Sequence, residues 1–335
     1  MISIAGAPKR IGLALSGGGF RAAAFHLGVM EELDRFNLLS KVDLLTCVSG
    51  GSIAGATVAL HWHSPNRLDV LRQYLTTRSV AVSSFIGGVI NPFESRLGYL
   101  ARSYDKHLFN GATLGALSNG PRIYLNATNL STGNMFFFVA GDSKAAEMGE
   151  HELGVVPAPH FPICSAVAAS SAFPPVFPPL RLDANDYPPA DAVEYVTLTD
   201  GGIYDNMGIN PLLRDRNALD YVIVSDGGMP FAIDSRPTES GTIVLKAGLD
   251  IMMEQIRGLE FDRLQHRYLA NKGPKPMWFS IDSRVGENQP GDASFASAIS
   301  TNLTRLGAEE MDVLTRHGAS LVRSRITAYA KELLT

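Results

Sequence analysis

The sequence predicts an α/β fold in which a central, mainly parallel sheet carries helices on its faces. A short apolar segment at Ile11–Leu15 runs into a glycine cluster, and helical spacing of apolar residues follows over residues 21–36. A second apolar segment, Val42–Val48, leads into a helix of small residues over residues 50–61. Two successive strand–loop–helix units are typical of parallel strands joined by crossover helices.

The rest of the chain contains further strand and helix signals. Turn residues at 131–134 separate two apolar segments and indicate a hairpin. The proline-rich sequence at 173–179 indicates an ordered loop, because proline breaks both helix and strand. We expect strands at 122–127, 135–140, 194–199, 221–225 and 277–281, and a helix at 249–269 with an apolar face of Ile251, Met252, Ile256, Leu259 and Leu264.

Composition restricts the class of protein. The 335 residues are 45% apolar and 19% charged, with a net charge of −4, which argues against a nucleic-acid partner. No apolar segment is long enough to span a bilayer, and the segment after Lys9 is too short and glycine-rich for a signal peptide. The two cysteines, Cys47 and Cys164, lie in apolar surroundings and indicate buried free thiols in a reducing, cytoplasmic compartment.

Ser49 lies at a strand-to-helix boundary that is similar to a nucleophile elbow. The elbow pattern G-x-S-x-G needs small residues two before and two after the serine, because the turn is crowded. Here these positions are Cys47 and Gly51, so the first glycine is replaced by cysteine. A plain turn explains the five residues equally well when they are taken alone.

The loop that follows the first strand contains Gly17, Gly18 and Gly19. Consecutive glycines at a helix N-terminus leave amide N–H groups that bind an anion, either a phosphate or the oxyanion of an acyl-transfer reaction. The spacing Gly17-x-Gly19-x-x-Ala22 also fits the dinucleotide fingerprint of a Rossmann-type protein. That fingerprint requires an acidic residue after the second strand, where this chain has Ser49.

The candidate bases for Ser49 are carboxylates. No histidine lies in a loop with partner residues around it, and His26 is expected to be a packed helical residue. Asp200 and Asp226 each follow a predicted strand and each begin an Asp-Gly-Gly sequence. We interpret Asp226 as part of a turn, since it lacks the Tyr-Asp-Asn continuation found after Asp200.

Four segments resemble motifs of the patatin-like phospholipases, and they occur along the chain in that family's order. They are the glycine loop at 16–21, the serine elbow, the stretch 165–179 and the sequence 200–206, and the resemblance covers about residues 11–225. It implies one three-layer α/β/α domain over residues 1–335, with a mainly helical extension at about 249–335 packed on the core. Cys47 and Ser16 depart from the family pattern, which has glycine and, in many members, aspartate at these positions.

The resemblance also implies lipid acyl hydrolysis by a Ser-Asp dyad without metal or cofactor. The carried-over roles are Ser49 as nucleophile, Asp200 as base and Gly17, Gly18 and Gly19 as the oxyanion loop. Arg21, Gly50, Gly51, Gly201 and Gly202 are expected to support these groups, although a solvent-facing Arg21 is an equal alternative. A catalytically silent lipid-binding module and a Rossmann-type protein remain the other interpretations.

The segment 80–93 has no charged residue and contains Gly87-Gly88 and Asn91-Pro92. Such residues often serve as hinges, and lipid must pass from a membrane to Ser49. We therefore expect this segment to contact membranes as a mobile cover, with ordinary core packing as the alternative.

Overall fold

The structure is a computed structural model that describes residues 2–4, 6–80, 95–231 and 240–334. Nearly all of the segment predicted to contact membranes, residues 80–93, lies outside the described residues; only Val80 is within them. In the part of the chain that the structure describes, no helix is both long and apolar enough to cross a membrane.

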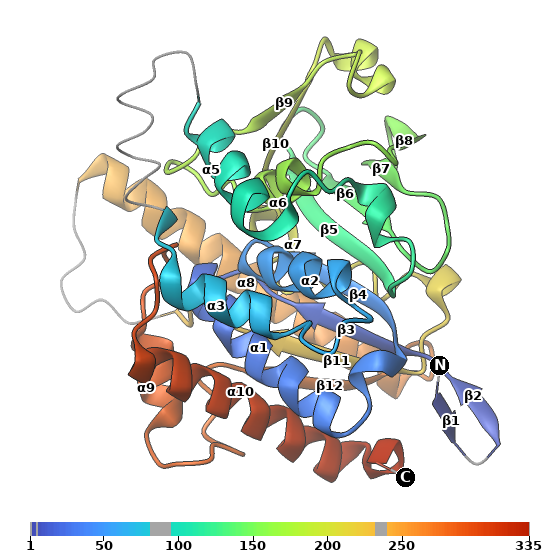
Figure 1. Ribbon diagram of the computed structural model, residues 1–335, viewed down its shortest axis with the longest axis vertical. Helices are drawn as coiled ribbons and strands as arrows, with labels where there is room; N and C mark the ends of the chain where they lie inside the picture. The colour runs from blue at the N-terminus through green and yellow to red at the C-terminus, as the bar shows by residue number, and fades with distance from the viewer. Residues whose placement is uncertain (1, 5, 81–94, 232–239, 335) are drawn as a thin grey trace.

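A ten-stranded mixed sheet forms the centre of the molecule (Figure 1). Its central strands run parallel in the order β12-β11-β3-β4-β5, and the rest of the sheet is antiparallel. The predicted α/β fold with a parallel central sheet is confirmed. The strands of this sheet are β3 (Ile11–Leu15), β4 (Val42–Val48), β5 (Arg122–Asn129), β6 (Met135–Ala140), β7 (Glu147–Glu150), β8 (Gly154–Pro157), β9 (Leu180–Leu182), β10 (Val196–Asp200), β11 (Tyr221–Asp226) and β12 (Lys275–Ser280).

Helices cover both faces of this sheet. In Figure 1, α1, α2 and α10 lie on the near face, and α8 lies behind the sheet. The helices, together with a separate hairpin of β1 (Ile2–Ile4) and β2 (Ala7–Lys9), are α1 (Gly19–Arg35), α2 (Gly50–Leu60), α3 (Asp69–Thr77), α5 (Arg96–Tyr104), α6 (Ile163–Ser170), α7 (Gly202–Asp205), α8 (Gly241–Leu269), α9 (Asp292–Ala298) and α10 (Ala308–Tyr329).

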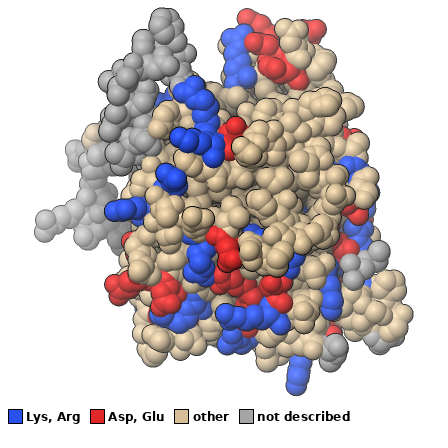
Figure 2. Space-filling view, viewed as in Figure 1, with Lys and Arg blue, Asp and Glu red and all other residues tan. Residues whose placement is uncertain are grey.

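The C-terminal part of the chain is built into the same layers. β12 pairs in parallel with β11, and α10 packs on α1. Both cysteines are buried free thiols, as the sequence indicates. In Figure 2, charged side chains of both signs alternate along the lower part of the molecule, and a broad uncharged area covers its middle.

The apolar face predicted for the helix at 249–269 is wrong in part. Leu264 is buried, but Met252 and Leu259 are 60% and 69% exposed, and Ile251 is exposed as well. α8 contacts the molecule through α7 and β12 on the side of Leu264. The exposed residues Ile251, Met252 and Leu259 therefore face away from the sheet, although the helical period had placed them on one face with Leu264.

Candidate active site

Ser49 forms a sharp turn between β4 and α2. Its backbone has φ 51° and ψ −115°, a conformation that residues other than glycine rarely adopt. Ser49 is partly exposed, whereas Val48 and Gly50 on either side are buried. This is the geometry of a nucleophile elbow, in which the strained turn presents the serine hydroxyl at the end of a strand.

The elbow leaves no space for side chains at the two following residues. A Cβ on Gly50 would lie 2.2 Å from the carbonyl oxygen of Gly19, and a Cβ on Gly51 would lie 2.0 Å from that of Leu15. The turn therefore packs backbone to backbone against β3 and the glycine loop. Any larger residue would separate the two loops.

Cys47 fits the elbow because α2 has a glycine opposite it. The Cys47 side chain is fully buried, and its sulfur lies 2.3 Å from the position that a Cβ on Gly55 would occupy. Burial raises the pKa of the Cys47 thiol well above its usual value, so the thiol stays protonated. The departure from the family pattern is thus accommodated within the core.

Asp200 reaches Ser49 because β10 runs toward the end of β4 along one edge of β5. β4 pairs with β5 as far as Val48 opposite Asn126, and β10 pairs antiparallel with β5 from the other end, with Asp200 opposite Ala127. β10 is therefore antiparallel to β4, and the carboxyl ends of the two strands meet head to head.

The carboxylate of Asp200 is held in a dry position beside the serine. Asp200 is 2% exposed and hydrogen-bonds to the Ser49 hydroxyl. Burial raises the pKa of Asp200 to about 7, although hydrogen bonds from the Gly202 amide and the Ser49 hydroxyl each lower it. A carboxylate with this pKa is a far better proton acceptor at neutral pH than an exposed one.

The two glycines after Asp200 shape the turn that holds it. The Gly202 N–H donates to Oδ1 of Asp200 at 2.8 Å. A Cβ on Gly201 would lie 2.3 Å from the carbonyl oxygen of Asn126, and one on Gly202 would lie 2.6 Å from Oδ1 of Asn206. Both positions therefore accept only glycine without movement of the site.

Ser170, at the end of α6, hydrogen-bonds to both Ser49 and Gly201, and it was not among the site residues predicted from the sequence. Its hydroxyl accepts a hydrogen bond from the Ser49 N–H at 3.0 Å and donates to the carbonyl of Asn126 at 2.6 Å. Its own carbonyl accepts from the Gly201 N–H at 3.3 Å. The only signal in the sequence was that Ser170 lies within the stretch 165–179, one of the four family-like segments.

The glycine loop contains two free amides and one that is occupied. Gly18 and Gly19 have φ values of 136° and 62°, and among the described residues their N–H groups have no hydrogen-bond acceptor. The Gly17 N–H donates to the carbonyl of Asn206 at 3.0 Å. Gly17 thus ties the loop to the segment after Asp200 and does not offer its amide to a ligand.

Arg21 is completely buried, so the alternative of a solvent-facing side chain is wrong. Its guanidinium donates to the carbonyl oxygens of Ser297, Ile299 and Gly227 at 2.9–3.1 Å. Burial lowers the pKa of Arg21 to about 10, partly offset by Asp226, so it stays charged at neutral pH. Arg21 joins α1 to two loops and cannot contact a lipid head group.

His26 belongs to the scaffold of the glycine loop. Its ring nitrogens lie 2.8 Å from the Ser225 hydroxyl and 3.0 Å from the Ser16 carbonyl. Burial lowers the pKa of His26 to about 4, so the ring is neutral at physiological pH. No histidine in the described ranges hydrogen-bonds to Ser49.

Asp226 takes part in a buried ion pair, and the interpretation of its sequence as a simple turn is incomplete. Its Oδ2 accepts from Nε of Arg257 at 2.6 Å, and Oδ1 accepts from the Gly228 N–H at 3.1 Å. This ion pair attaches α8 to the end of β11.

Within the described residues, no group of three or more potential metal ligands is present.

Comparison with protein families agrees with this geometry. The family model described as patatin-like phospholipase matches residues 13–213, which contain Ser49, Asp200 and the glycine loop. The chain belongs to the patatin-like phospholipase family. No curated protein sequence matches it significantly.

Solved structures show the same patatin-like fold. Human GIVD cytosolic phospholipase A2 is similar with a TM-score of 0.61 at 12% identity. The same human enzyme in complex with methyl gamma-linolenyl fluorophosphonate inhibitor and terbium chloride gives 0.57 at 14% identity. Each comparison covers 97% of this patatin-like chain but only 60% and 59% of the other, so the chain spans about three-fifths of their length.

The Rossmann-type alternative does not fit the loop geometry. The Phe20 N–H at the start of α1 donates to the carbonyl of Asn302 at 3.0 Å. A Cβ on Gly19 would lie 2.2 Å from the carbonyl oxygen of Thr301. The backbone of residues 301–302 therefore occupies the Phe20 amide, one of the donors at the helix N-terminus that a pyrophosphate would use in a dinucleotide-binding protein.

Proposed function

We propose that this patatin-like chain is a lipid acyl hydrolase that cleaves carboxylic esters of phospholipids, lysophospholipids or related lipids. The observation that carries the proposal is the strained backbone of Ser49 together with its hydrogen bond to the buried Asp200. The human enzyme in the comparison was solved with a lipid-like fluorophosphonate, which supports an acyl-chain substrate.

In this proposal Ser49 is the nucleophile and Asp200 the general base. The Ser49 oxygen forms a bond to the ester carbonyl carbon while its proton moves to Asp200. The carbonyl π electrons move to the oxygen, and the free amides of Gly18 and Gly19 stabilise that oxyanion. The alcohol then leaves with the proton from Asp200, and an acyl-enzyme remains on Ser49.

The second half of the reaction uses the same groups. Asp200 accepts a proton from water as the water oxygen attacks the acyl carbonyl. The Ser49 oxygen leaves, takes the proton back, and the fatty acid is released. Ser170 is a positioning residue in this scheme, because it holds the Ser49 amide and the Gly201 amide at once.

A mixed lipid panel tests the proposal directly. We expect the purified chain to release fatty acids from one or more lipids of the panel, and Ser49→Ala to release none above background, as measured by mass spectrometry of the products. Methyl gamma-linolenyl fluorophosphonate should phosphonylate Ser49 with loss of fluoride, giving a mass increase on one peptide. Ser131→Ala, a surface serine variant, should label like the wild type.

Three results would contradict the proposal in different ways. Turnover retained in Ser49→Ala would exclude the nucleophile. A folded wild-type protein that binds lipid but neither turns it over nor labels would be a silent lipid-binding module. Saturable binding of NAD or NADP to the wild-type protein would favour the dinucleotide alternative.

A further inference from the structure

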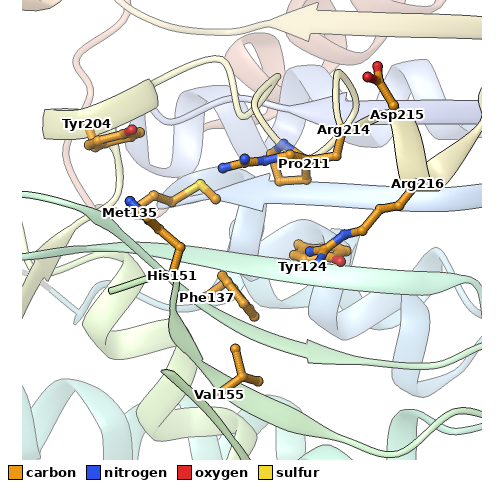
Figure 3. A pocket seen from close by; sticks show the side chains of 10 residues that line it. All are labelled: Tyr124, Met135, Phe137, His151, Val155, Tyr204, Pro211, Arg214, Asp215 and Arg216. Carbon is orange, nitrogen blue, oxygen red and sulfur yellow. The ribbon is translucent and has the colours of Figure 1, made fainter. Parts of the chain in front are cut away.

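A cavity lies beside the apolar cluster that contains Leu264 of α8, and Tyr124, Met135 and Phe137 belong to both. Its volume is about 300 Å³, and Figure 3 shows the side chains that line it. The floor is formed by Tyr124 of β5 with Met135 and Phe137 of β6, and Tyr204 of α7 contributes to its wall. Neither Ser49 nor Asp200 lines this cavity, so it is separate from the dyad.

Two arginines give the cavity a positive charge. Arg214 and Arg216 both line it and both are exposed, and in the described part of the chain neither is in an ion pair. Figure 3 shows that Asp215, between them, points away from the other lining side chains. Asp215 pairs with Arg267, so its charge is already balanced. The cavity is positive although the whole chain carries a net charge of −4.

This combination of surfaces selects an amphiphilic anion. Guanidinium groups bind carboxylate and phosphate through paired hydrogen bonds. The apolar floor of Tyr124, Met135 and Phe137 would be covered favourably by an alkyl chain. A neutral polar molecule would gain nothing from the two charges, and a cation would be repelled.

We propose that this cavity, which we call the arginine pocket (Arg214, Arg216, Tyr124, Met135, Phe137 and Tyr204), binds a single-chain lipid with an anionic head group. The head is either the carboxylate of a long-chain fatty acid or the phosphate of a lysophospholipid. The binding site does not depend on the proposed hydrolysis, because neither Ser49 nor Asp200 lines it. Tyr204 lies four residues after Asp200, so a ligand in the pocket would contact α7, the helix that follows Asp200.

The test measures binding to the full chain carrying Ser49→Ala, which prevents turnover. Dodecanoate and dodecyl phosphate are titrated below their micelle concentrations by calorimetry, with dodecyl maltoside, acetate and inorganic phosphate as probes lacking either the charge or the chain. We expect both anionic amphiphiles to bind. The double variant Arg214→Gln/Arg216→Gln should weaken them at least about tenfold, as expected for the loss of charged hydrogen bonds.

A matched control separates local contacts from net charge. Lys272→Gln/Arg284→Gln removes two exposed cations that do not line the pocket, and its affinities for the two anionic probes should stay within about twofold of the Ser49→Ala parent.

The anionic probe that binds more tightly identifies the head group. Equal binding by the two double variants, equal binding of dodecyl maltoside, or equal binding of acetate or phosphate alone would overturn the proposal. In otherwise wild-type protein, Arg214→Gln/Arg216→Gln should hydrolyse a soluble ester normally, so loss of the pocket and loss of catalysis are distinguishable.

Discussion

Ser49 is held in its strained turn by contacts on several sides. The Ser170 hydroxyl accepts a hydrogen bond from the Ser49 amide, and the Asp200 carboxylate accepts one from the Ser49 hydroxyl. The carbonyl of Gly19 packs directly against Gly50, the next residue in the chain. A φ of 51° at a residue with a side chain costs free energy, so it persists only where surrounding structure imposes it. The surroundings of Ser49 therefore favour a reactive position over the most stable one.

Removal of either member of the dyad should abolish ester hydrolysis without unfolding the protein. We expect Ser49→Ala and Asp200→Ala each to lower kcat/KM by about 10⁴-fold or more, because residues that act as a unit lose most of the rate when one is removed. Initial rates on a soluble ester and circular dichroism spectra are the measurements. Activity within a few-fold of wild type in either variant, with Ser131→Ala as the unaffected reference, would sink the assignment.

The pH dependence of the reaction should follow Asp200. Its pKa of about 7 belongs to the folded enzyme, and the base must be ionised to accept a proton, so kcat/KM should fall about tenfold per pH unit below 7 and level off above it. His26, with a pKa near 4, does not titrate in this range. Rates on a soluble ester from pH 5 to 9 provide the measurement. A profile that is already flat at pH 5 would contradict a buried carboxylate base.

The same pKa shift has the opposite effect on stability. The pKa of Asp200 is raised above its unfolded value, so the folded state favours the protonated form. The stabilising contribution is complete below about pH 4 and is lost as the pH rises through 7. In the proposed mechanism, activity therefore rises over the same pH interval in which this one residue reduces stability.

At the scale of elements, an ion pair attaches α8 to the sheet. Arg257 of α8 contacts Asp226 at the end of β11, and their side chains are 18% and 1% exposed. Arg257 also pairs with Glu254 at 3.1 Å on its own helix. The Asp226–Arg257 pair lies inside the structure, where loss of one charge leaves the other poorly compensated.

Asp226→Asn should therefore lower stability while leaving catalysis nearly intact. We expect the free energy of unfolding to fall by about 2–3 kcal/mol, since Arg257 keeps Glu254 as a partner and some contact with water. Turnover per folded molecule should remain within an order of magnitude, because Asp226 does not reach Ser49.

Urea titration and active-site-normalised rates test both parts. Asp183→Asn is the control, because Asp183 pairs with Arg181 on the surface and loss of that pair should not change the urea midpoint measurably. If Asp226→Asn is inactive and Asp200→Asn is active, the base has been wrongly assigned.

At the scale of the whole molecule, the C-terminal helix α10 packs on α1, the helix that begins at the glycine loop. The family model ends at residue 213, whereas α10 lies far beyond it and packs on α1. The two helices touch backbone to backbone at reciprocal glycines. A Cβ on Gly28 would lie 1.9 Å from the carbonyl oxygen of Thr315, and one on Gly318 would lie 2.2 Å from that of Phe25.

A single added methyl group should show how close this contact is. Gly28→Ala should destabilise the protein by about 1–3 kcal/mol or more, because the helices must separate to admit the side chain. Gly258→Ala is the matched control on exposed α8, where a Cβ would meet no atom within 4 Å. It should stabilise by about 0.5–1 kcal/mol through helix propensity. Thermal melts of both variants check the opposite signs, and equal effects would refute close packing of α1 on α10.

The sequence by itself determined the local parts of this protein. Apolar segments predicted β3, β4, β5, β6 and β11 to within a few residues, because buried strands consist mostly of apolar residues. Glycine clusters marked the loop and the elbow, because only glycine tolerates the close backbone contacts found there. These features depend on neighbours in the chain, so a linear pattern records them.

Only the tertiary structure decided how the parts meet. Ser49 and Asp200 come together because β10 pairs antiparallel with the part of β5 that β4 leaves open, and strand pairing of this kind depends on which edges are free. The burial of Arg21 and the hydrogen bond from Ser49 to Ser170 depend on partners more than a hundred residues apart in the chain, Arg21 with Ile299 and Ser49 with Ser170. Helical period likewise predicted an apolar stripe on α8 but not which side of that helix would meet the sheet. Long-range contacts of this kind leave no periodic trace in a sequence, and they alone bring the serine, the carboxylate and the free amides to one place.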